Sequence, residues 1–137
     1  MAYKLAGATP LFLVFDMIEA VAFYRDLLGF EVVNASPEVE APEGRFSHWV
    51  FLRRDQAELM LNTAYDSGER PPIRDEIHWA GHADTALYLA CEDVDAAYAH
   101  VVSKGIAAPP PIMTPYGLKT FEVTDPDGYT LVFQSRG

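Results

Sequence analysis

The chain has 137 residues, half of them hydrophobic and 12% aromatic, which predicts one compact domain and excludes disorder as its dominant state. The formal net charge of −10 at pH 7 argues against nucleic acids and anionic membrane surfaces as partners. Cys91 is the only cysteine, so an internal disulfide is excluded. The sequence shows no signal pattern and no apolar run long enough to span a bilayer. We therefore expect a cytoplasmic protein.

The first predicted elements are a strand and a helix. Residues 9–16, "TPLFLVFD", form an apolar run that predicts a strand ending at Asp16. Asp16 and Glu19 have the spacing of a capping box, and the apolar residues that follow recur at helical spacing as far as Leu28. Gly29 stands where a helix C-cap belongs, which predicts the end of the helix.

The rest of the first half predicts strands joined by turns. Residues 30–33 indicate a short strand. Residues 34–44 contain two prolines and several acidic residues, so we expect an exposed loop there. Residues 46–54 and 57–63 then predict a hairpin, with Asp55-Gln56 as its two-residue turn.

The second half repeats this order. Residues 85–93 predict a strand, and the next helix begins after Asp93 and ends at Gly105. A proline-rich connector leads to two closing strands at 118–124 and 129–135, joined by the turn "DPDG". The two helix starts, Asp16 and Asp93, lie 77 residues apart.

The sequence therefore predicts an α+β fold made of two βαβββ modules in tandem. We place module one at about 5–63, a linker at about 64–82 and module two at about 83–136, all within a single domain. A module this short cannot bury its sheet face alone, so the two halves must pair.

Two stretches, "AVAFYRDLLGFEVV" in the first half and "DPDGYTLVF" in the second, are similar to those of the vicinal oxygen chelate superfamily. This superfamily includes glyoxalase I, extradiol dioxygenases, fosfomycin-resistance enzymes and bleomycin-resistance proteins. The resemblance covers nearly the whole chain. It implies curved mixed sheets that enclose a shared ligand groove on the face away from the helices.

The resemblance also implies where a metal would bind. Metal-dependent members carry ligands on the first and last strand of each module, and the matching positions here are Thr9, Met60, Ala86 and Val132. None of these is the imidazole or carboxylate that a divalent metal needs. We therefore predict that the protein has no metal and no other cofactor.

Other candidates for chemistry are weaker. His78 and His82 have the i, i+4 spacing of a helical zinc pair, but they lie in the predicted linker and surface positions explain them better. Likewise, the predicted hairpin sets Glu58 opposite Arg53, where a cross-strand ion pair accounts for it better than a general base. His48 stands beside Trp49 in a predicted strand, and a lone histidine of this kind is more often structural than catalytic. We therefore assign no catalytic residue.

Strand parity predicts which residues line the groove, because alternate side chains of a strand share a face. If Asp55-Gln56 forms a two-residue turn, Trp49 and Phe51 face Asn62 and Met60. A symmetric hairpin around residues 125–128 adds Phe121 to the groove. The predicted ligand-binding residues are Leu11, Leu13, Trp49, Phe51, Met60, Asn62, Tyr88, Tyr116, Phe121 and Val132.

Within the superfamily the chain most resembles the bleomycin-resistance proteins, which also have "Pro-aromatic-Gly" before the penultimate strand, here Pro115-Tyr116-Gly117. That resemblance implies antibiotic resistance through a homodimer that binds an amphipathic, cationic small molecule without changing it. The alternative is a glyoxalase- or dioxygenase-like enzyme with an unrecognised metal site or acid–base pair. Metal analysis would separate these two hypotheses.

Overall fold

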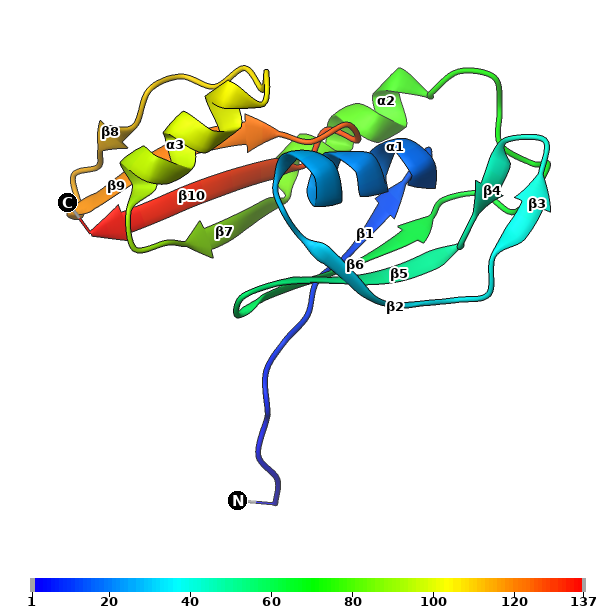
Figure 1. Cartoon of the computed structure of the whole chain (residues 1–137), viewed down its shortest axis with the longest axis horizontal. Helices are drawn as coiled ribbons and strands as arrows, with labels where there is room; N and C mark the ends of the chain where they lie inside the picture. The colour runs from blue at the N-terminus through cyan, green and yellow to red at the C-terminus, as the bar shows by residue number, and fades with distance from the viewer. Residues whose placement is uncertain (1, 137) are drawn as a thin grey trace. The chain divides into compact units, whose positions relative to one another are not determined.

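The computed structural model describes residues 2–136 and divides the chain into two compact units, one ending at Pro72 and one beginning at Ile73. Each unit contains a four-stranded mixed sheet with a helix packed against it (Figure 1). The predicted α+β fold with tandem βαβββ modules is therefore confirmed. No helix among residues 2–136 is long and apolar enough to cross a membrane.

Unit 1 contains the strands of one main sheet, in the order β1-β6-β5-β2, with β1 parallel to β6 and the other pairs antiparallel. A two-stranded sheet, β3-β4, accompanies it. The elements in chain order are β1 (Leu11–Val14), α1 (Met17–Val21), the π-helix η1 (Ala22–Leu27), β2 (Glu31–Ala35), β3 (Val39–Ala41), β4 (Gly44–Phe46), β5 (Trp49–Arg54) and β6 (Ala57–Thr63).

The helical segment of unit 1 begins and ends as its sequence predicts. The Asp16 carboxylate accepts a hydrogen bond from the Glu19 backbone N–H at 3.2 Å, and Gly29 closes the segment with a φ of 82°. The α-helix is shorter than predicted, because its second half is a π-helix. There the Leu28 N–H bonds to the Phe23 carbonyl, five residues earlier.

The core of unit 1 lies between this helical segment and one face of the sheet. Alternate residues of the central strands fill it, and Leu52, Leu59 and Leu61 are fully buried. Each such leucine contributes roughly 1.5–3 kcal/mol by leaving water. Tyr24 adds aromatic packing through an edge contact with Phe30 at 5.9 Å.

The prediction of an exposed loop at residues 34–44 is partly wrong. Strands β3 and β4 pair there as a small hairpin. Arg45 reaches across the hairpin to Glu38 and Glu40, with both ion-pair distances at 3.2 Å. Glu40 lies directly opposite Arg45, and Glu38, just before β3, reaches the same arginine, so charge pairs stabilise the hairpin.

Unit 2 contains the second mixed sheet, in the order β7-β10-β9-β8, and α3 packs against β9 and β10. The pairing of β7 with β10 is parallel, and the other pairs are antiparallel. The elements are α2 (Glu76–Ala80), the 3₁₀-helix η2 (Gly81–Asp84), β7 (Ala86–Ala90), α3 (Val94–Ser103), β8 (Ile112–Met113), β9 (Leu118–Thr124) and β10 (Thr130–Arg136).

The turn between β9 and β10 is longer than predicted. The buried Asp125 carboxylate accepts the backbone N–H groups of Asp127 and Tyr129, each at 2.9 Å. The ladder therefore begins with Thr124 opposite Thr130. This pairing is offset by one residue from the symmetric hairpin, and such an offset moves every β9 side chain to the other face of the sheet.

The predicted position of Phe121 is consequently wrong. Its ring stacks on Phe133 at 4.8 Å and meets the edge of Tyr98, on α3, at 5.5 Å. Phe121 thus belongs to the buried layer between the sheet and α3 and is removed from the set of ligand-binding candidates.

The segment predicted as a linker contains α2 and η2, which pack on the turn before β10. Trp79 is only 5% exposed, and the His82 ring stacks on Tyr129 at 4.1 Å. His82 Nδ1 also lies 2.8 Å from the carbonyl oxygen of Asp127, which it reaches as a donor. His82 is therefore an anchor of this segment within unit 2, whereas His78 is exposed as predicted.

Candidate ligand-binding faces

The open face of the unit 1 sheet is the side away from its helical segment. The hairpin turns at Asp55, whose φ of 52° suits a tight two-residue turn. The register then pairs Trp49 with Asn62 and Phe51 with Met60. The predicted parity of β5 and β6 is confirmed, and these four side chains lie on one face.

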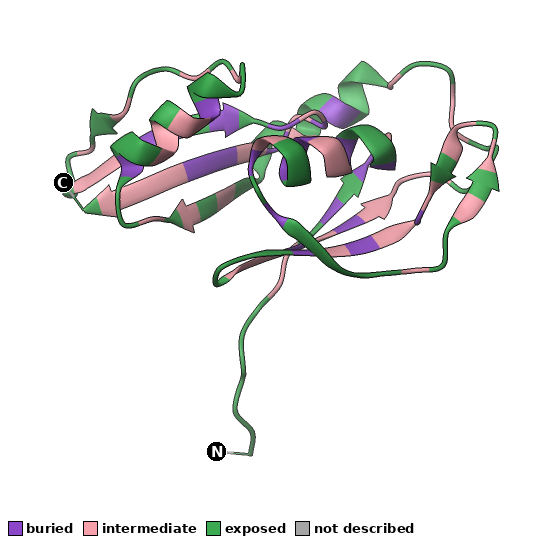
Figure 2. Cartoon of the chain, in the orientation of Figure 1, coloured by how far each residue is buried: buried purple, intermediate pink, exposed green. Residues whose placement is uncertain are grey.

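Strand β1 extends this face with two more apolar residues. Leu11 pairs with Met60, and Leu13 lies opposite Asn62. Leu11 and Leu13 are 46% and 37% exposed, whereas the alternate residues Phe12 and Val14 are buried. The alternation along the strands is visible in Figure 2. A sheet with one buried face normally carries polar residues on the other, so apolar residues at these positions mark a surface that fits a partner molecule.

We call the six residues Leu11, Leu13, Trp49, Phe51, Met60 and Asn62 the aromatic face. Its two rings, Trp49 and Phe51, lie 6.4 Å apart at 68° to one another. The Arg53 guanidinium lies 6.0 Å from the Phe51 ring and forms an ion pair with Glu58 at 2.9 Å. This pair matches the predicted cross-strand contact. The ion pair neutralises the charges of Arg53 and Glu58 at the edge of the aromatic face. The two rings are then the main surface that a ligand can contact.

The open face of the unit 2 sheet is more polar. Val132 is opposite Tyr88 on one side and Glu122 on the other. Thr130 and Gln134 share this face by parity. Tyr88 is 53% exposed, so its ring is accessible, whereas Val132 is buried. This face therefore combines an aromatic ring with a carboxylate.

Glu122 is a candidate that sequence reasoning missed. The symmetric hairpin predicts it on the helix side, and the actual register puts it beside Val132. The signal that could have revealed it is Asp125, because an aspartate at the start of a turn often caps amides further along and lengthens the turn.

Tyr116 lies in the turn between β8 and β9 and is 66% exposed. The turn is closed by Thr114, whose hydroxyl and backbone N–H both bond to the Leu118 carbonyl. Tyr116 is therefore on neither sheet face, and its role in ligand binding stays a prediction.

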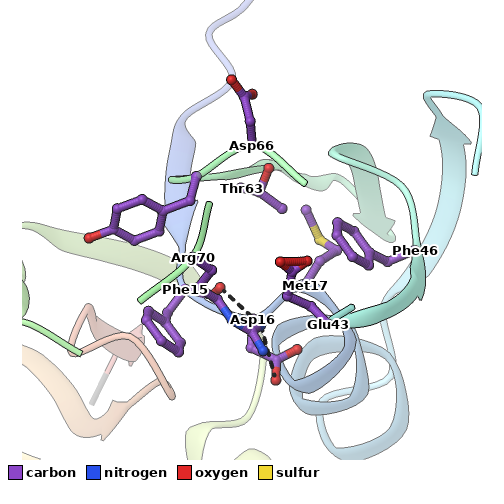
Figure 3. Close-up of a pocket in the computed structure, with 9 residues that line it drawn as sticks. Phe15, Asp16, Met17, Glu43, Phe46, Thr63, Asp66 and Arg70 are labelled. Atoms are coloured by element: carbon purple, nitrogen blue, oxygen red, sulfur yellow. Dashed lines mark hydrogen bonds and ion pairs between the residues drawn. The ribbon is translucent and has the colours of Figure 1, made fainter. Parts of the chain in front are cut away.

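A separate depression in unit 1 lies between the end of β1, the start of α1 and the loop after β6 (Figure 3). Its cavity volume is about 10 Å³, room for about one water molecule and far below the roughly 300–1,000 Å³ typical of ligand pockets. Arg70 occupies part of it, with an ion pair to Asp16 at 3.7 Å and its guanidinium 4.9 Å from the Phe15 ring. The residues that line it are Phe15, Asp16, Met17, Glu43, Phe46, Thr63, Tyr65, Asp66 and Arg70. None of the predicted ligand-binding residues is among them.

The structure does not assemble a recognisable metal centre within residues 2–136, where no three His, Cys, Asp or Glu side chains are grouped to hold an ion. Of the four positions at which the resemblance predicts metal ligands, Met60 belongs to the aromatic face and Val132 is buried. The absence of a bound metal from the protein stays a prediction.

Cys91 is expected to react slowly. Burial first, and the nearby Asp93 carboxylate second, raise the pKa of the Cys91 thiol above its usual value. A higher pKa lowers the thiolate fraction at pH 8, and the thiolate is the reactive form. We expect iodoacetamide to modify the folded chain more slowly than the urea-unfolded chain, and the difference to narrow as the pH rises. Equal rates at pH 8, measured by mass spectrometry, would contradict this.

Comparison with known families gives one match over most of the chain. The model of the Glyoxalase/Bleomycin resistance protein/Dioxygenase superfamily matches residues 8–133. No curated protein sequence matches the chain.

Three solved structures illustrate the likeness in fold. TnmS3, an antibiotic binding protein from Streptomyces sp. CB03234, is 25% identical, with 98% of this chain and 100% of that chain covered and a TM-score of 0.65. A bleomycin resistance determinant encoded on the transposon Tn5 is 21% identical, with 96% and 98% covered and a TM-score of 0.71. A bleomycin-binding protein complexed with bleomycin is 21% identical, with 97% and 100% covered and a TM-score of 0.70.

Proposed function

Because this chain belongs to the Glyoxalase/Bleomycin resistance protein/Dioxygenase superfamily, we propose that it is a small-molecule-binding protein that captures an amphipathic ligand on the aromatic face without a metal. The observation that carries this proposal is the register of β5 and β6, which sets Trp49 and Phe51 side by side on the open side of the sheet. Two rings beside apolar side chains offer a planar ligand a large contact area with little loss of conformational entropy.

The solved structures support binding as the activity. TnmS3, at 25% identity over nearly the full length of both chains, is an antibiotic binding protein. The two bleomycin-related proteins, at 21% identity, support the fold alone. An antibiotic with a planar apolar part and a cationic part fits the aromatic face and the net charge of −10 together.

The metal-free character rests on the residue types at four positions. Thr9, Met60, Ala86 and Val132 stand where metal-dependent relatives carry their ligands, and they offer no imidazole or carboxylate. Binding without a metal distinguishes this proposal from the alternative of a glyoxalase- or dioxygenase-like enzyme.

Elemental analysis of the purified protein tests this point. We expect less than about 0.1 equivalent of Zn, Ni, Fe or Mn per chain, because the donor set at these positions does not suit them. Binding of metal-free bleomycin, measured by calorimetry, should be the same with and without EDTA. About one tightly held metal per chain, with ligand binding lost in EDTA, would contradict the proposal and favour the enzyme.

We also propose a cytoplasmic homodimer. Strands β1 and β7 are terminal strands of their sheets, each with one neighbour, and Leu11 and Leu13 are exposed beside the β1 edge. Open edges and apolar surface of this kind favour pairing with a second copy. Sedimentation equilibrium at tens of micromolar should give twice the chain mass of 15.2 kDa. A monomer at that concentration would count against pairing, while leaving ligand binding to be measured separately.

A further inference from the structure

A chain of three polar side chains lies beside the depression in unit 1. His48 and Thr63 face one another at the end of the β5–β6 hairpin, where the Thr63 backbone N–H donates to the His48 carbonyl at 2.9 Å. Their side chains also meet, with His48 Nδ1 2.5 Å from Thr63 Oγ1. On its other side, His48 Nε2 lies 2.8 Å from the hydroxyl of Ser67. The Phe46 ring meets the imidazole edge-on at 5.0 Å and holds its plane.

These contacts suit a nucleophile and its base. With its proton on Nδ1, neutral His48 donates to Thr63 and leaves Nε2 to accept the hydroxyl proton of Ser67. A hydroxyl bonded to an imidazole whose other nitrogen is held by a third group is the arrangement that activates serine nucleophiles. Ser67 lies in an exposed turn, so its hydroxyl is accessible.

The residue that follows Ser67 supplies a second feature of such sites. The Gly68 N–H donates to the carboxylate of Glu43, with N–O distances of 2.7 and 3.2 Å. In acyl-transfer sites the N–H of the residue after the nucleophile helps to hold the oxyanion. Here the Glu43 carboxylate already accepts the Gly68 N–H, in the position that an oxyanion would take. Glu43, Phe46 and Thr63 line the same depression (Figure 3).

We propose that Ser67 and His48 form a nucleophile–base pair that reacts with small activated acyl esters, that Thr63 is its positioning residue, and that Glu43 covers the anion position in the resting protein. This activity is distinct from ligand capture on the aromatic face. Ser67 and His48 do not line the depression, and its cavity volume of about 10 Å³ is too small for an acyl group, so the ester approaches Ser67 from the exposed side of its turn.

The reaction balances without a cofactor. Ser67 Oγ attacks the ester carbonyl and its proton passes to His48 Nε2. The C–O bond to the leaving alcohol breaks, and that oxygen takes the proton from His48. Water then attacks the acyl-serine by the same route, which releases a carboxylic acid and restores Ser67.

A fluorophosphonate probe tests the pair directly, because it forms an O–P bond to an activated serine and releases fluoride. Mass spectrometry of the labelled full-length chain gives the rate at each serine. We expect Ser67 to react on the order of 10²-fold faster than Ser103, since a positioned base contributes about 10²–10⁴-fold. Ser103 is a matched control because its hydroxyl donates to the His100 carbonyl, at 2.6 Å.

Variants separate chemistry from folding, with circular dichroism to confirm that each is folded. H48Q should lower the Ser67 rate to that of Ser103. T63V should slow labelling, while T63S retains it, because only the latter keeps the oxygen that holds Nδ1–H. E43Q should speed it by weakening the contact with Gly68. Labelling of Ser67 no faster than Ser103, or equal rates for T63V and T63S, would overturn the proposal.

Discussion

Replacing Trp49 with alanine is expected to weaken ligand binding by roughly 1–3 kcal/mol, which corresponds to about 5- to 150-fold in Kd. Trp49 lies on the open side of the sheet, opposite Asn62 and beside the Phe51 ring. Its truncation removes the largest apolar contact of the aromatic face. Calorimetric titration with metal-free bleomycin measures the change.

The neighbouring residue provides a matched control. Val50 is 4% exposed and belongs to the opposite, buried side of the same strand. Val50→Ala should lower the free energy of unfolding by about 1–3 kcal/mol and leave the affinity of the folded protein unchanged. Trp49→Ala should lower the ligand affinity and leave the free energy of unfolding nearly unchanged. If Trp49→Ala lowered stability and left affinity unchanged, the aromatic face would be core and not a binding surface.

Replacing Asp125 with alanine is expected to lower the free energy of unfolding by about 3–5 kcal/mol. The buried carboxylate accepts two backbone N–H groups, from Asp127 and Tyr129. Alanine leaves both donors unpaired, and the two residues that carry them, Asp127 and Tyr129, are buried. Urea denaturation measures the loss.

Asp125→Asn is the matched control, because its amide oxygen keeps an acceptor at the same place. We expect it to cost clearly less than alanine. If alanine and asparagine were equally tolerated, the Asp125 carboxylate would not set the length of the turn, and another cause would be needed for the offset register of β9 and β10.

The two hairpins show what the sequence could and could not predict. The β5–β6 register follows from local chemistry, since Asp55-Gln56 is a two-residue turn and fixes which side chains face which. The β9–β10 register depends on a side chain that bonds into the turn. Asp125 adds one residue to the loop, so Phe121 moves to the α3 side and Glu122 to the open face.

Other features of the molecule depend on contacts between distant residues. Helix α2 spans five residues and is followed by Gly81, so its helical propensity is weak. It is held by His82, whose ring stacks on Tyr129 just before β10, and the Trp79 ring in turn meets the His82 ring at 4.6 Å. The sequence could not reveal this, because the partners lie more than 40 residues away.

The candidate site was predictable where strand alternation determines it. Leu11, Leu13, Trp49, Phe51 and Met60 all lie on the face that parity assigned to them. The partners of His48 were not predictable, because Ser67 reaches it through a loop whose path has no periodic pattern. The alternation of residues along a strand predicts which side chains share a face. The contacts that loop residues make can be read only from the structure.

The most direct test of ligand capture by the aromatic face is ¹⁹F NMR of protein labelled with 5-fluorotryptophan. The chain has two tryptophans, Trp49 on the aromatic face and Trp79 buried in unit 2, so each reports on one place. In a titration with metal-free bleomycin in EDTA, we expect the Trp49 resonance to shift and saturate while the Trp79 resonance stays in place. A ligand that binds and moves only the Trp79 resonance, or that moves neither until a metal is added, would contradict the account.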